Sequence, residues 1–236
     1  MAGLAGDALR KARPGPPAIW SEYAGLLEAH YGVFHPTHDY VIHARGPGGM
    51  AAYVAAFRAA DPEFVVTFHA GYWLHIHKHL IADWEFYEAV FENYEVVTRT
   101  EVGHLWKRRP GPWRSPAGDA WTPVPLDLPD AFTLPPVPGA DRVAVVEVGY
   151  EIRRTPGWYL PVLGQSPRYL LFPFDCGTDL PIPARPYADR MTFPIRVNPG
   201  QAPRFYATVR SLVGGRWVLT GVRARPMSGH ATAGYL

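Results

Sequence analysis

Nine prolines lie between Pro110 and Pro138 of this 236-residue chain. Proline fixes φ and has no backbone N–H, so this stretch cannot form a regular helix or a central strand. A chain of this length has room for two small domains. The sequence therefore predicts four parts: a flexible tail (residues 1–17), an α/β domain (18–109), a Pro-rich bridge (110–139) and a β-sandwich domain (140–236). Trp113 and Trp121 predict a bridge that lies against a surface.

The residues before the bridge alternate between helix and strand patterns. Apolar residues at helical spacing predict helices over 19–30, 50–60 and 84–94, with Asp83 as N-cap of the third. Short apolar runs predict strands over 39–45, 64–68, 95–100 and 104–108. Strands and helices in this order predict a small, mostly parallel sheet covered by helices.

The residues after the bridge carry strand patterns only. Alternating or short apolar runs separated by Pro, Gly and Asp predict strands over 142–153, 168–174, 190–197, 204–212 and 216–224. Several short strands at near-regular spacing are typical of an antiparallel sandwich, here expected to be jelly-roll-like.

Charge and cysteine content exclude some classes of protein. The net charge of +2 is too small to indicate nucleic acid as a partner. Cys176 is the single cysteine, so neither an internal disulfide nor a cysteine metal cluster is expected. The sequence shows no signal-peptide pattern and no apolar run long enough for a membrane span. No cofactor is expected.

A glycine-rich segment, Gly46-Pro-Gly-Gly-Met-Ala51, lies between a predicted strand and a predicted helix. It satisfies the G-x-G-x-x-A form of the dinucleotide fingerprint, in which backbone amides at a helix start hold a phosphate. However, no acidic residue follows the next strand, and Pro47 removes one amide. An ordinary glycine-rich turn is the favoured interpretation, with Gly48 and Gly49 kept as ligand-binding candidates.

Nine of the ten histidines fall between His30 and His104. His75, His77 and His79 have a spacing that zinc or nickel sites use, but no fourth ligand is evident, so a solvated face is favoured over a metal site. His43 and His69 lie at the carboxyl ends of two predicted strands, which is the edge where open α/β sheets bind ligands. An imidazole there could act as a general acid or base.

Aromatic and basic residues give two further candidates for binding. Trp158 and Trp217, in the predicted β domain, could stack on sugar rings or belong to the core. The basic run at residues 107–109, close to two tryptophans, superficially suits a nucleic-acid or anionic-glycan surface, but a solvated strand end and loop is the more common explanation.

The pattern of aromatic and apolar positions over residues 20–110 resembles a known group of proteins. The segments that carry the resemblance are Asp39-Tyr-Val-Ile-His-Ala44, the run from Tyr53 to Thr67, the run from Trp84 to Val97, and Leu105-Trp-Lys-Arg-Arg109. They resemble the soluble C-terminal region of polytopic, GT-C-like glycosyltransferases of bacterial membranes. The resemblance implies an extracytoplasmic accessory region beside a membrane-embedded active site. It transfers no catalytic residue, because the catalytic acidic residues of such enzymes lie in the membrane part.

The sequence thus predicts a non-catalytic accessory or glycan-binding module that works with a membrane glycosyltransferase portion or subunit and contacts a saccharide or lipid-linked sugar. A chain of this kind is expected at the extracytoplasmic face of the membrane, or in the cytoplasm if it stands alone. The alternative is a small soluble enzyme with a ligand site around His43, His69 and the Gly46–Gly49 turn.

Overall fold

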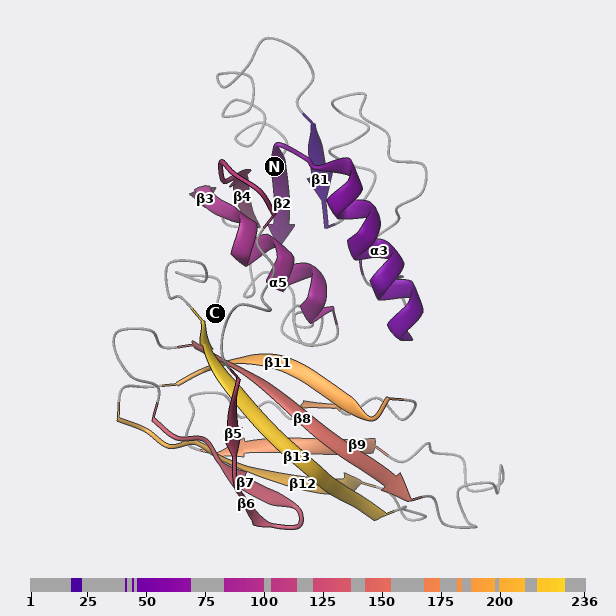
Figure 1. The fold of residues 1–236 in the computed structure, drawn as a ribbon, viewed down its shortest axis with the longest axis vertical. Coiled ribbons are helices and arrows are strands. Elements are labelled where there is room, and N and C mark those ends of the chain that lie inside the picture. The colour runs from indigo at the N-terminus through magenta and orange to yellow at the C-terminus, as the bar shows by residue number, and fades with distance from the viewer. Residues whose placement is uncertain are drawn as a thin grey trace. The chain divides into compact units, whose positions relative to one another are not determined.

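The computed structural model divides into two compact units: unit 1, Met1–Gly118 with Ala231–Tyr235, and unit 2, Asp119–His230 with Leu236 (Figure 1). The residues that the structure describes are 18–22, 41, 44, 46–68, 83–99, 103–113, 121–136, 143–153, 168–174, 182–183, 188–197, 200–210 and 216–227. The predicted tail over 1–17 lies outside them. Among the described residues, no helix is both long and apolar enough to cross a membrane.

The described part of unit 1 contains a four-stranded sheet and two helices. Its elements are β1 (Ile19–Ser21), α3 (Gly46–Ala60), β2 (Phe64–Phe68), α5 (Trp84–Asn93), β3 (Tyr94–Arg99) and β4 (Gly103–Arg108). The strand order is β1-β2-β4-β3. Only β1 and β2 are parallel, whereas β4 pairs antiparallel with both β2 and β3.

The sheet of unit 1 is therefore mixed, and the prediction of a mostly parallel sheet was wrong. β1 and β2 run in the same direction because a long crossover that includes α3 connects them. Only residues 100–102 separate β3 from β4, and so short a connection joins antiparallel neighbours.

Two local predictions, a helix over 19–30 and a strand over 39–45, were also wrong at the residues that the structure describes, which are 19–22, 41 and 44. Ile19, expected in a helix, begins β1, and Ile19, Trp20 and Ser21 pair with Phe64, Val65 and Val66 of β2. Val41 and Ala44, the two described residues of the strand predicted over 39–45, form a turn in which the Ala44 N–H donates to the Val41 carbonyl at 3.0 Å.

The remaining elements of unit 1 agree with the sequence analysis. The predicted helices over 50–60 and 84–94 correspond to α3 and α5, and the strands predicted over 64–68, 95–100 and 104–108 correspond to β2, β3 and β4. α3 begins four residues earlier than predicted, so Gly46–Gly49 is its first turn and not a separate turn. The Asp83 side chain makes no capping hydrogen bond; its backbone carbonyl accepts from Phe86 at 3.0 Å.

An aromatic cluster fills the space between the helices and the sheet. Phe57 of α3 is completely buried, and its ring contacts those of Trp20, Phe86, Tyr94 and Trp113 at centroid distances of 5.3, 5.2, 5.8 and 5.4 Å. Offset and edge-on ring pairs at such distances add to the hydrophobic stabilisation. Phe57 thus ties both helices to the sheet of unit 1.

Unit 2 contains only strands in its described part. They are β5 (Thr122–Val124), β6 (Leu126–Leu128), β7 (Ala131–Thr133), β8 (Val143–Arg153), β9 (Arg168–Phe174), β10 (Ile182–Pro183), β11 (Arg190–Arg196), β12 (Arg204–Arg210) and β13 (Arg216–Met227). They form two sheets, in the orders β10-β9-β12-β7-β6 and β11-β8-β13-β5, and every pairing is antiparallel.

The five strands predicted in this part of the chain correspond to β8, β9, β11, β12 and β13. The exclusion of central strands from residues 110–139 was wrong, because β7 pairs on one side with β6 and on the other with β12. β7 itself contains no proline. The prolines of this stretch that are described lie in the edge strand β5, as Pro123, or outside the strands, as at Pro129.

The two bridge tryptophans pack as the sequence predicted. Trp113 lies against Phe57 and Tyr94 of unit 1. In unit 2 the guanidinium groups of Arg223 and Arg225 lie 4.7 and 5.4 Å from the ring centroid of Trp121. Each ring is thus held by the unit to which it belongs.

Candidate functional site

Most of the predicted site residues lie outside the described part of the chain: His43, His69, His75, His77, His79 and Trp158. Gly48, Gly49 and Trp217 are described. Within the described residues, no group of three or more His, Cys, Asp or Glu side chains could hold a metal ion.

Trp217 is not available for stacking on a sugar. Its side chain is only 6% exposed and packs edge-on against Tyr150, with ring centroids 5.8 Å apart. The core interpretation of this tryptophan is therefore correct, because it lies at an alternate position of β13 that faces the interior of unit 2.

Gly48 and Gly49 lie in the first turn of α3. A Cβ atom at Gly49 would come within 3.1 Å of the Ala44 carbonyl carbon, whereas one at Gly48 would have nothing within 4 Å. Close packing of the helix start against the preceding turn explains why position 49 is a glycine. A bound phosphate is not needed to account for it.

A buried carboxyl group lies where β1 ends. The Glu22 side chain is wholly buried. One of its oxygens accepts a hydrogen bond from the Tyr87 hydroxyl of α5 at 2.5 Å, and the other accepts from the Phe68 N–H of β2 at 2.9 Å. The carboxyl group therefore connects the ends of both parallel strands to a helix.

A hydrogen bond to the Glu22 side chain replaces one backbone hydrogen bond of the parallel β1–β2 ladder. The Glu22 N–H donates to the Val66 carbonyl at 2.9 Å, which continues the pairing of β1 with β2. In a regular ladder the Phe68 N–H would next reach the Glu22 carbonyl. That carbonyl instead accepts from the Val41 N–H at 3.2 Å, and the carboxyl group accepts from Phe68.

Burial governs the protonation of this group. Desolvation raises the pKa of the Glu22 carboxyl from 4.5 to about 7, although the hydrogen bonds from Tyr87 and Phe68 favour the ionised form. A carboxyl group with a pKa near neutrality exchanges protons readily under ordinary conditions. Such a shift in a buried acid is a recognised sign of a functional site.

Two further polar side chains continue from Glu22 across the sheet. Ser21 pairs with Val66, so Glu22 lies beside Thr67, and Thr67 pairs with His104 of β4. Thr67 and His104 are each 1% exposed. The indole N–H of Trp106, on the α5 side of the sheet, donates to the Thr67 hydroxyl at 2.8 Å. We call Glu22, Thr67, Phe68, Tyr87 and His104 the strand-end site.

The strand-end site shares one element with the sheet-edge site expected from the sequence, the carboxyl end of β2. That expectation placed His43 at the end of the first strand, but the first strand is β1 and the residue after it is Glu22. The second strand was assigned correctly, and its end supplies the Phe68 N–H. An isolated glutamate within a segment of helical spacing carries no sequence signal of burial, so sequence reasoning missed it.

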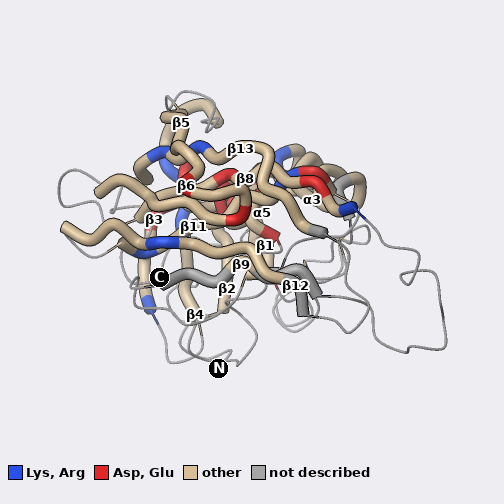
Figure 2. The backbone as a smooth tube through the Cα atoms, turned by 90° about the horizontal axis from the view of Figure 1, so that it is seen from below, with Lys and Arg blue, Asp and Glu red and all other residues tan. Residues whose placement is uncertain are grey.

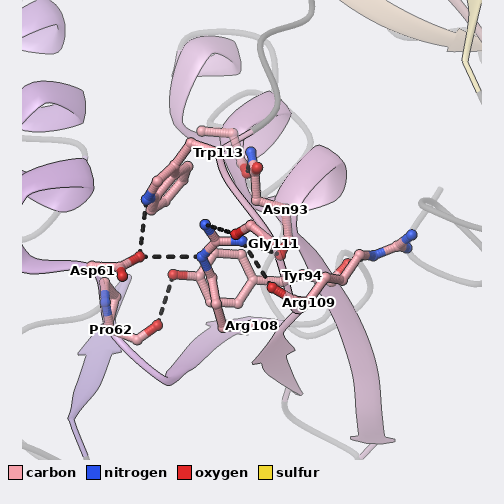
Figure 3. A network of polar contacts seen from close by, with 9 residues as sticks. Asp61, Pro62, Asn93, Tyr94, Arg108, Arg109, Gly111 and Trp113 are labelled. Atoms are coloured by element: carbon pink, nitrogen blue, oxygen red, sulfur yellow. Dashed lines mark hydrogen bonds and ion pairs between the residues drawn. The ribbon is translucent and has the colours of Figure 1, made fainter.

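A second polar cluster lies at the other end of the sheet (Figure 3). The Asp61 carboxylate accepts from Arg108 Nε at 3.2 Å and from the indole N–H of Trp113 at 2.9 Å. The Arg108 guanidinium also stacks 4.4 Å from the centroid of the Trp113 ring and donates to the Asn93 carbonyl at 3.3 Å. The Tyr94 hydroxyl donates to the Pro62 carbonyl at 2.8 Å.

This cluster has a structural role, and it engages two residues of the basic run at 107–109. Arg108 bonds to Asp61 and stacks on Trp113, and Arg109 Nε donates to the Tyr94 carbonyl at 2.9 Å. Asp61 joins α3 to this cluster from a left-handed conformation with φ of 39°. Figure 2 shows acidic and basic positions interspersed along the described chain.

Replacing Arg108 with lysine is expected to lower the free energy of unfolding of unit 1 by about 1–2 kcal/mol, because lysine keeps the charge but loses the planar stack and the forked donors. Urea unfolding followed through the amide signals of β2 and β4 would measure this loss. Arg58→Lys, at an exposed position of α3, is the matched control and should change little. Equal effects of the two substitutions would contradict the role given to Arg108.

Comparison of the chain with known protein families, with curated proteins and with solved structures finds no match. Function is therefore inferred from the chemistry of the strand-end site.

Proposed function

We propose that unit 1 binds a small polar molecule at the carboxyl ends of β1 and β2 and exchanges a proton with it through Glu22. The observation that carries the proposal is the wholly buried Glu22 carboxyl group, held between the Tyr87 hydroxyl and the Phe68 N–H. The carboxyl ends of parallel strands are where α/β sheets commonly bind ligands.

The chemistry of the site fits an acid–base role. In its neutral form Glu22 can donate a proton, and in its ionised form it can accept one; with the pKa near 7, both forms are populated at neutral pH. Tyr87 fixes the orientation of the carboxyl group through its hydroxyl. This role corresponds to the enzyme alternative from the sequence, with Glu22 in place of His43 as the reacting group.

A binding screen against Glu22 tests the proposal. The compounds are monosaccharides, sugar nucleotides, small carboxylic acids and amines, and binding is read from the ¹³C signal of the Glu22 carboxyl group. Glu22→Gln is expected to weaken binding of a hit by roughly tenfold or more, since hydrogen bonds to charged groups are worth about 1.5–3 kcal/mol. Glu85→Gln, at an exposed position of α5, should leave binding unchanged.

Two outcomes would contradict the proposal. One is that no compound perturbs the Glu22 signal. The other is that each hit binds wild type, Glu22→Gln and Glu85→Gln with the same affinity, which would place binding elsewhere on the chain.

An accessory, glycan-binding role beside a membrane glycosyltransferase is a second proposal, and it concerns unit 2. What supports it is the all-antiparallel pairing of unit 2, together with the contact of Phe193 in one sheet with Phe205 in the other at a centroid distance of 6.1 Å. We propose that the two sheets form a jelly-roll-like sandwich, an architecture that many lectin domains share. A glycan array tests it: Trp158→Ala should weaken a genuine hit, and an array without hits would contradict it.

A further inference from the structure

Three chain segments far apart in sequence bond to Glu22. Its N–H bonds to Val66, its carbonyl bonds to Val41, and its carboxyl group bonds to Phe68 and to Tyr87. The last two bonds cross 46 and 65 residues of chain. A single titratable side chain therefore holds the ends of β1 and β2 together and attaches both to α5.

The two protonation states of Glu22 do not hold this junction equally well. A neutral carboxyl group tolerates burial, whereas a carboxylate loses the hydration that it would have in water, and two hydrogen bonds replace that hydration incompletely. The same loss of hydration makes the buried carboxylate hold a proton more tightly, and this is why the pKa of Glu22 is raised to about 7. Any local opening that lets water reach the carboxylate is therefore favoured once the group is ionised.

We propose that ionisation of Glu22 opens the carboxyl ends of β1 and β2 and thereby controls access to the strand-end site. The inference rests on the proposed function for its biological meaning, since it makes the ionised form of Glu22, which accepts a proton, also the accessible form. Opening here means loss of the Phe68-to-Glu22 and Tyr87-to-Glu22 hydrogen bonds, while the earlier rungs of the β1–β2 ladder remain.

Other buried titratable groups lie on or beside the elements that pack against this junction. They are Tyr87 on α5, Asp83 immediately before α5, Tyr53 on α3, which accepts from the Trp20 indole N–H at 2.9 Å, and His104 on β4. Glu22 differs from them because its carboxyl group bonds to both β2 and α5, through Phe68 and Tyr87.

Amide hydrogen exchange of the full chain between pH 5 and pH 8 tests the inference, with protection factors corrected for intrinsic exchange. The opening constant at the Phe68 amide is expected to rise by up to tenfold per pH unit between pH 4.5 and about 7, and then to level off. The Phe64 amide, which donates to the Ala18 carbonyl at 3.0 Å at the other end of the same strand pair, is the internal control and should show no such rise.

Glu22→Gln should abolish the rise at Phe68, because glutamine stays neutral, whereas His104→Gln should retain it. Should either variant fail to fold, the wild type still decides: the ¹³C titration of the Glu22 carboxyl group and the Phe68 opening should level off at the same pH. Three results would overturn the inference. The opening constant of the Phe68 amide could be independent of pH, the opening constant of the Phe64 amide could rise equally, or the Glu22 carboxyl group could titrate near pH 4.5. None of these measurements uses a ligand, so a failed ligand screen leaves their outcome untouched.

Discussion

Replacing Phe57 with alanine is expected to lower the free energy of unfolding of unit 1 by about 3–5 kcal/mol. The Phe57 ring is fully buried and lies at the centre of the aromatic cluster, in contact with rings from β1, α5, β3 and the segment after β4. Its removal leaves a cavity that these large, rigid rings cannot close by small movements. The ring–ring contacts are lost in addition.

Urea unfolding of the full chain, followed through the amide signals of β2 and β4, measures this effect without interference from unit 2. Val97→Ala is the matched control, because Val97 lies in the same sheet but is 49% exposed, and its loss should cost less than about 0.5 kcal/mol. A loss below about 1 kcal/mol for Phe57→Ala would show that the cluster does not hold unit 1 together. A parallel loss in the β8 and β13 signals would show that the two units do not unfold independently.

The agreement between sequence and structure is closest where a segment's own pattern decides its structure. β8 alternates buried and outward residues over most of its length, and its strand pattern is visible in the sequence. α5 likewise carries an apolar stripe of helical spacing, which includes Trp84, Tyr87 and Phe91. Neither element needs knowledge of a distant partner to be assigned.

The disagreements arise where a distant partner decides. The residues of β1 fit a helical pattern, and they become a strand because β2 offers a parallel edge 45 positions further along the chain, as at Ile19 and Phe64. β7 is only three residues long, and it pairs with β12, a strand far away in the sequence. Short segments have weak intrinsic preferences, so tertiary pairing overrides them.

The strand-end site was predictable in location but not in composition. The rule that ligands bind at the carboxyl ends of parallel strands needs only the end of β2, which the sequence indicates correctly. Identifying Glu22 needs the end of β1 and the position of Tyr87 on α5, and both follow from tertiary packing. A charged residue is rarely buried completely, so burial of this glutamate is not an expectation that sequence alone would support.

The stability of unit 1 is expected to decrease as the pH rises from about 4.5 to about 7, by about 2–3 kcal/mol on account of Glu22. The pKa of this carboxyl group is higher in the folded chain, at about 7, than the ordinary value of 4.5 that it has when unfolded. Between these values the folded state binds more protons than the unfolded state, so raising the pH favours unfolding. The contribution is fully present below pH 4.5 and is lost above pH 7; each pKa unit corresponds to about 1.4 kcal/mol.

The quantity that isolates Glu22 is the difference in unfolding free energy between wild type and Glu22→Gln, measured by urea unfolding at pH 5, 6, 7 and 8. Histidines and other acids titrate in both proteins and cancel in this difference. Glutamine stays neutral at every pH and can still accept from the Phe68 N–H, so the wild type should lose stability relative to the variant as the pH rises. The corresponding difference for Glu85→Gln, an exposed glutamate of α5, should not vary with pH.

Two other results would contradict this expectation. A difference for Glu22→Gln that does not change with pH would mean that water already reaches this carboxyl group in the folded protein. A change of the opposite sign would mean that the hydrogen bonds from Tyr87 and Phe68 outweigh the burial of the carboxyl group.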